Sequence, residues 1–112
     1  MTSFDWIEGF EGGFTVCNLS GIVLQMNEKA AEIYREYGGS ALIGQNLLDC
    51  HPEPARKKLL HLLHSGERNI YTIEKNGIKK LVYQVPWICD GRRSGAVELV
   101  LPIPFEMPHF LR

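Results

Sequence analysis

The sequence predicts an α+β domain in which an antiparallel sheet carries short helices on one face. Strand-like runs occur at both ends of the 112-residue chain, and the middle has helical spacing. Two strong hairpin turns, Asn76-Gly77 and Asp90-Gly91, divide the last third. The expected order is β-β-α-α-α-β-β-β, in which strands and helices form separate runs, as is typical of α+β folds.

The first two strands and the first helix are expected before residue 39. FTVCNLSGIVLQ (14–25) alternates weakly and breaks at Asn18–Gly21, which indicates a hairpin. Asn27 suits a helix N-cap, and apolar residues follow it at helical spacing until Gly38-Gly39 ends the run.

Two further helices are expected in the middle of the chain. A short helical turn around Leu47-Leu48 stops before Pro52, because the residue preceding a proline disfavours helical backbone. Pro54 suits the first turn of the next helix, which ends at Ser65-Gly66.

Three strands complete the predicted sheet: 68–74, 78–88 and 93–101. In the middle one of these, alternate residues point to opposite faces, and both sets are largely apolar. One set is Leu81, Tyr83, Val85 and Trp87; the other is Val82, Gln84, Pro86 and Ile88. The helices cover one face, so the other face needs a cover too. We expect the N-terminal segment and a second copy of the chain to provide it.

The chain divides into a flanking segment (1–13), a domain (14–104) and a tail (105–112). The flanking segment is expected to form a short helix that lays apolar side chains over the sheet, namely Phe4, Trp6, Ile7 and Phe10. Prolines at 102, 104 and 108 argue against regular structure at the tail. Its Phe105, Met107 and Phe110 predict that the tail packs back on the domain or on a partner copy.

Composition excludes several classes of function. A net charge of −1 argues against the positively charged surface that binding to nucleic acid or to an anionic membrane needs. No stretch is long enough for a membrane span, and the start of the chain does not read as a signal peptide. Three cysteines without C-x-x-C spacing favour a reduced, cytoplasmic compartment.

The order of elements and three stretches resemble the PAS domain family over nearly the whole chain. The stretches are GIVLQMNEKAAEIY, LIGQNLLDCHP and DGRRSGAVELVLPI. The resemblance implies a five-stranded antiparallel sheet with a pocket between the sheet and the middle helices. It also implies a sensor or an adaptor rather than an enzyme, with a small ligand, haem, flavin or nothing in the pocket.

Strand parity and helical phase give the residues expected to line this pocket. They come from the helices and from the last two strands, where parity leaves two registers open, with Glu98 as the alternative to Leu99. The candidates are Ile33, Tyr34, Tyr37, Leu47, His51, Leu59, Leu63, Tyr83, Gln84, Val85 and Leu99.

Three histidines lie close together in LDCHPEPARKKLLHLLH (48–64). His61 and His64 fall on the polar side of their helix, beside Lys57, so they are expected to be solvated. His51 lies at a junction before a proline, where it either bonds a backbone group or reaches the pocket as a ligand contact or haem ligand. Adjacent Cys50 and His51 do not make a metal site or a nucleophile pair, because sequence neighbours seldom converge.

The sequence therefore predicts a non-enzymatic sensory module that binds a small ligand and signals through protein–protein contacts. A homodimer through the sheet face and the N-terminal segment is expected, with a separate signalling protein in trans. The alternatives are a haem-based gas or redox sensor that uses His51, and a ligand-free dimerisation adaptor.

Overall fold

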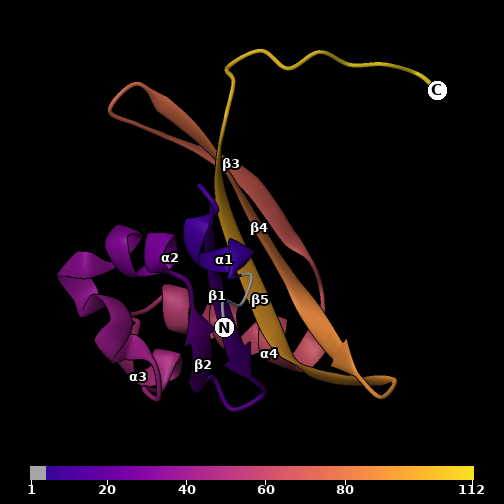
Figure 1. Ribbon diagram of the computed structural model, residues 1–112. Coiled ribbons are helices and arrows are strands. Elements are labelled where there is room, and N and C mark those ends of the chain that lie inside the picture. The colour runs from indigo at the N-terminus through magenta and orange to yellow at the C-terminus, as the bar shows by residue number, and fades with distance from the viewer. Residues whose placement is uncertain (1–4) are drawn as a thin grey trace.

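The computed structural model describes residues 5–112, apart from the side chain of Cys50 (Figure 1). The α-helices are α1 (Trp6–Gly9), α2 (Glu28–Ile33), α3 (Leu47–Cys50) and α4 (Ala55–Ser65), and the 3₁₀ helices are η1 (Arg35–Tyr37) and η2 (Gly39–Leu42). The strands are β1 (Gly13–Asn18), β2 (Val23–Met26), β3 (Asn69–Lys75), β4 (Ile78–Cys89) and β5 (Arg92–Ile103). None of the helices in this described part is long and apolar enough to cross a membrane.

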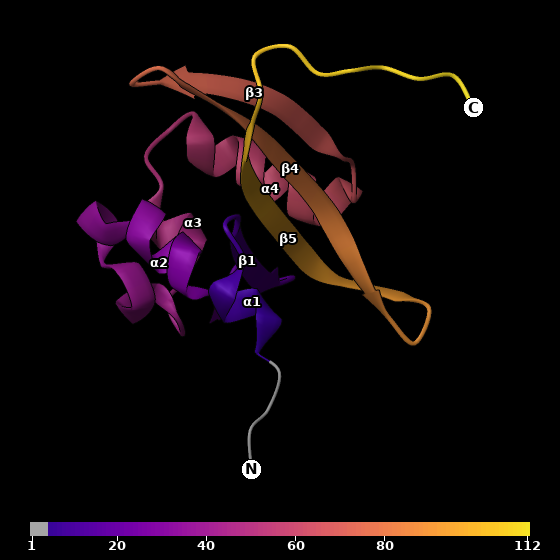
Figure 2. The same ribbon diagram turned by 45° about the horizontal axis from the view of Figure 1, so that its top comes forward.

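The five strands form one sheet in the order β2-β1-β5-β4-β3, and every neighbouring pair is antiparallel. Helices α2, α3 and α4 gather on the same side of this sheet (Figure 2). The predicted fold class, an α+β domain with a five-stranded antiparallel sheet, is confirmed. We call the face toward α2–α4 the inner face and the opposite one the outer face.

Asn27 joins the N-terminal segment to the body of the domain. It is 1% exposed, and its Oδ1 accepts hydrogen bonds from the amides of Phe14 and Ala30, both at 2.9 Å. Its Nδ2 donates to the carbonyls of Ile7 at 2.7 Å and Gly12 at 2.9 Å. The predicted N-cap thus also fixes α1 and the residues between α1 and β1, well before its own helix.

The short helix predicted in the flanking segment is present as α1. Its aromatic residues meet the start of β1: the ring of Phe14 lies 6.1 Å from that of Trp6 and 5.6 Å from that of Phe10. A Cβ added at Gly12 would touch the side chains of Phe10, Leu99 and Leu101, so these three side chains lie close together. The segment covers part of the outer face, as expected; Phe4 lies outside the described residues.

The first helix is shorter than predicted. α2 ends at Ile33, and the chain continues to Leu42 in two 3₁₀ turns through Gly38 and Gly39, whose φ values are +117° and +55°. A Cβ at Gly39 would lie 3.1 Å from the Ala31 carbonyl oxygen. The glycine pair lets the chain fold back tightly on α2, so the helix unwinds earlier than its apolar spacing indicates.

The last strand is longer than predicted and includes Pro102. β1 pairs with β5 only as far as Gly13 opposite Val100, and beyond that point β5 pairs with β4 alone. Pro102 therefore occupies an edge position, where its missing N–H leaves no partner strand unsatisfied.

The C-terminal tail leads away from the domain in both views (Figures 1 and 2). Phe105, Met107 and Phe110 are 52%, 60% and 67% exposed. The prediction that the tail packs back on its own domain is therefore wrong. The hydrogen bond from Lys79 Nζ to the Phe105 carbonyl at 3.4 Å buries too little surface to hold the tail against the domain. Packing on a partner copy stays a prediction.

Candidate ligand-binding cavity

A cavity of about 630 Å³ lies between the middle helices and the inner face of the sheet. Most of its wall is apolar, and this part comes from β2, η2, α3 and α4. Those side chains are Val23, Met26, Leu42, Leu47, Leu59 and Leu62. Exposed Tyr37 and Lys58 line it from the solvent side. A volume of this order is common for small-molecule sites, which also combine apolar walls with a few polar groups.

Four polar side chains cross the sheet in register beneath the cavity. Thr15 on β1 pairs with Glu98 on β5, Glu98 with Gln84 on β4, and Gln84 with Asn69 on β3. Residues directly opposite each other in antiparallel strands face the same side, so these four form one line. We call Thr15, Glu98, Gln84 and Asn69 the polar row; all four line the cavity.

Hydrogen bonds tie the polar row together and link it to the helices. Asn69 Nδ2 donates to Gln84 Oε1 at 2.6 Å, and Gln84 Nε2 donates to Glu98 Oε2 at 2.7 Å. The other carboxylate oxygen, Oε1, accepts from the hydroxyl of Tyr34, which lies at the C-terminal end of α2. Glu98 therefore links the helices on one side of the cavity to the sheet on the other.

Burial raises the pKa of Tyr34 far above its ordinary value, and the charge and hydrogen bond of Glu98 raise it further. Tyr71, which also lines the cavity, has its pKa raised by burial and then by Glu98. Both effects disfavour a phenolate beside the carboxylate. The Tyr34 hydroxyl thus keeps its proton and remains a donor to Glu98.

The structure takes the register in which Gln84 and Glu98 face the helices. Of the predicted pocket residues, those that line the cavity are Tyr34, Tyr37, Leu47, His51, Leu59 and Gln84. Ligand binding by these residues stays a prediction.

Five predicted residues do not line the cavity, for two physical reasons. Tyr83, Val85 and Leu99 have the opposite strand parity from Gln84 and Glu98, so they point to the outer face. The other two are packing residues: Ile33 meets β1 at Gly13, and Leu63 is 1% exposed in the core.

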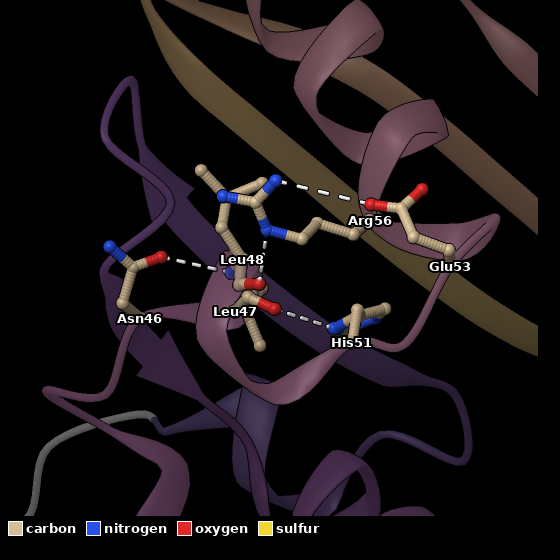
Figure 3. A network of polar contacts seen from close by, with 6 residues as sticks. All are labelled: Asn46, Leu47, Leu48, His51, Glu53 and Arg56. Atoms are coloured by element: carbon tan, nitrogen blue, oxygen red, sulfur yellow. Dashed lines mark hydrogen bonds and ion pairs between the residues drawn. The ribbon is translucent and has the colours of Figure 1, made fainter.

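His51 caps α3 and lies on the cavity wall (Figure 3). Its Nδ1 is 2.7 Å from the Leu47 carbonyl oxygen. Arg56 fixes the same junction, since its Nε donates to the Leu48 carbonyl at 3.1 Å and a guanidinium nitrogen lies 3.9 Å from Glu53. His51 thus makes the backbone bond, which is one of the two roles that the sequence left open, and it also lines the pocket; contact with a ligand or haem stays a prediction.

The other two histidines of this stretch lie away from the cavity. His61 and His64 are exposed on the polar side of α4, and His61 Nε2 lies 3.0 Å from a carboxylate oxygen of Glu67. Their solvated positions agree with the helical phase, which turns Leu59 and Leu62 to the cavity instead.

Sequence reasoning missed several lining residues, including Thr15, Asn69 and Tyr71. Asn69 lies inside the predicted strand 68–74, where nothing in the sequence separates it from other polar strand residues. Thr15 reads as an ordinary strand residue. The signal that would have found them is the register itself, because Gln84 fixes Asn69 on one side and Glu98 on the other.

No family model and no curated protein matches the sequence, whereas solved structures match the fold. The PAS domain from Bordetella pertussis BvgS is similar with a TM-score of 0.62 at 15% identity, over 88% of this chain and 82% of that one. The chain has a PAS-like fold.

Two other structures with this PAS-like fold belong to sensor proteins. The sensor region of a sensor histidine kinase matches 80% of the chain at 23% identity, with a TM-score of 0.58. This chain spans 38% of that region's length. The Aer2 receptor from Vibrio cholerae, described as a dual PAS-heme oxygen sensor, matches 88% of this chain and 99% of its own at 15% identity, with a TM-score of 0.57. At these identities the likeness is one of fold.

Proposed function

We propose that this chain is a sensory module that binds a small ligand in the cavity and signals through protein–protein contacts, without catalysis. The observation that carries the proposal is a cavity of about 630 Å³ in which a polar row crosses an otherwise apolar wall. The sensor proteins among its structural neighbours support the same assignment.

The bond between Tyr34 and Glu98 offers a route from ligand to signal. It connects the end of α2 to β5 across the cavity. A ligand that engages Glu98 changes the strength of this bond and favours a different placement of the α2–η1 segment. The signal is then a population shift between two arrangements, set by the difference in ligand affinity for them.

The outer face is the proposed dimer surface. It carries the half-buried side chains of Phe14, Val16, Tyr83, Val85 and Leu99. Beside it Trp6 is 62% exposed although it packs on Phe14. An apolar face bordered by an exposed tryptophan is typical of association surfaces, so we propose a homodimer through this face and α1. Free thiols at Cys17 and Cys89 are consistent with a reduced, cytoplasmic setting.

Two measurements on the purified protein test the proposal. Mass spectrometry after denaturation should release a stoichiometric small molecule, and sedimentation velocity should give a dimer. A protein that releases nothing, binds nothing and sediments as a dimer would instead be a ligand-free adaptor. A monomer without ligand contradicts both assignments.

A haem-based gas or redox sensor is the second candidate, favoured by the imidazole of His51. The Leu47 carbonyl can only accept, so Nδ1 carries the hydrogen and Nε2 of the neutral ring keeps its lone pair. Metal-ligating histidines commonly show this arrangement. His51 is thus the residue that would hold the iron of a bound haem, and haem would supply gas-binding or electron-transfer chemistry.

The visible spectrum of protein expressed with haem supplied tests this second candidate. A Soret band that disappears in His51→Ala would assign His51 as the axial ligand. A colourless wild-type protein removes haem and leaves the small-ligand proposal standing.

A further inference from the structure

Glu98 is the one acidic residue among the described residues that line the cavity. It is half-buried, and no lysine, arginine or histidine within residues 5–112 forms an ion pair with it. Its hydrogen-bond partners, Tyr34 and Gln84, are neutral. A carboxylate that is withdrawn from water without a cation is unfavourable, and its surroundings favour the arrival of a positive group.

The polar row also has unused hydrogen-bonding capacity. Each carboxylate oxygen of Glu98 accepts one hydrogen bond and can accept another. Next to it, Thr15 Oγ1 is buried and finds no partner in the described part of the chain. A buried hydroxyl without a partner is rare in folded proteins. The Thr15 hydroxyl oxygen is closed off from the cavity, so the carboxylate oxygens of Glu98 are the acceptors of this pair that a ligand can reach.

The apolar part of the cavity wall favours a ligand with a hydrocarbon part. Leucine, valine and methionine side chains surround the space above the polar row, and in that region of residues 5–112 the wall offers no second carboxylate. Resting on the function proposed above, we infer that the ligand is a cationic amphiphile. Its protonated amine lies against Glu98, and its hydrocarbon part lies against Leu42, Leu59 and Leu62.

An anionic head group, the opposite polarity, would have to pair with Lys58 or with a protonated His51. The side chain of Lys58 lines the cavity from an exposed position on α4. Water and salt screen a charge pair there, whereas the pair at Glu98 is shielded by the sheet and the helices. Burial thus favours the cation at the polar row over the anion at Lys58.

The test compares three probes of equal chain length: n-octylamine, n-octanol and n-octanoate. Each is titrated into ¹⁵N-labelled protein, and amide shifts of the cavity strands give the dissociation constants. The titrations are repeated with Glu98→Gln, which removes the charge and keeps the shape. Glu74→Gln, on the exposed part of β3, is the matched control for loss of one negative charge.

Octylamine should bind at least about tenfold more tightly than octanoate, since hydrogen bonds to charged groups contribute that much. Glu98→Gln should weaken octylamine about tenfold and leave octanol unchanged, which also shows that the variant is folded. Glu74→Gln should change nothing. Octanoate binding as tightly as octylamine, or an unchanged octylamine affinity in Glu98→Gln, overturns the cationic ligand and leaves the sensory proposal intact. Failure of all three probes to shift the cavity amides contradicts both.

Discussion

The side chains on the two faces of the sheet differ in polarity, although the same strands form both faces. On the inner face the polar row lies beneath a cavity; hydrogen bonds join Asn69, Gln84 and Glu98 in that order, and Glu98 also accepts from Tyr34. On the outer face, Tyr83, Val85 and Leu99 present apolar surface that α1 covers only in part. The contrast teaches that recognition chemistry and association surface can alternate residue by residue along one strand.

The largest effect on stability is expected at Asn27, whose side chain links α1, β1 and α2. Asn27→Ala removes four hydrogen bonds from a buried site and releases α1 from the start of α2. We expect a loss of about 3 kcal/mol in the free energy of unfolding, measured by urea denaturation. Asn46→Ala is the matched control, because that cap accepts one hydrogen bond, from the Leu48 amide; it should cost about 1 kcal/mol. Equal losses in the two variants would contradict this role of Asn27.

A charge on the outer face should separate association from ligand binding. Val85→Glu places a carboxylate in the proposed dimer surface, and we expect the dimer to weaken about 30-fold, or about 2 kcal/mol, by sedimentation. Ligand affinity should stay the same, because Val85 does not line the cavity. Ile43→Glu, at an apolar residue that is 45% exposed near η2, serves as the control and should leave the dimer intact. A dimer that survives Val85→Glu would require another interface.

On the inner face, Tyr34→Phe should reduce stability by about 1 kcal/mol at neutral pH through loss of the bond to Glu98. The raised pKa of Tyr34 means that the folded state keeps a proton that the unfolded state loses above about pH 10. The stabilising contribution is present below that pH and is lost as the pH rises.

Urea denaturation between pH 9 and 11 measures this difference. Wild type should lose stability more steeply than Tyr34→Phe, by at most about 1.4 kcal/mol per pH unit. Tyr37→Phe, at a tyrosine that is 72% exposed, is the control and should follow wild type. Parallel slopes for wild type and Tyr34→Phe would contradict the raised pKa of Tyr34, to which burial contributes most and Glu98 next.

The smallest effect is expected outside both faces. His61→Gln removes an exposed contact with Glu67 on the polar side of α4. The free energy of unfolding should change by less than about 0.5 kcal/mol, and the ligand or haem signal should not change at all. A His61 variant that alters the visible spectrum would reassign the histidine role from His51.

The hairpins could be predicted from the sequence because their signals are local. Asn76-Gly77 and Asp90-Gly91 all have positive φ, as the two-residue turns between β3, β4 and β5 require. Asn27 likewise read as a cap from its neighbours alone. Such features need only a few adjacent residues, so the fold class followed from them.

The polar row could not be predicted because it depends on four strands in register. Both faces of β4 are largely apolar, so parity around Gln84 did not show which face meets the helices. The early end of α2 depends on the approach of Gly39 to Ala31, which is a contact of the folded chain. Where the sequence left two registers open, tertiary pairing decided between them.

The most direct measurement is a high-resolution crystal structure of the protein purified without any added ligand. The account predicts non-protein density in the cavity, with its polar end against Glu98. A cavity closed by Tyr34, Leu59 and Leu62, with no density between α4 and the polar row, would contradict it.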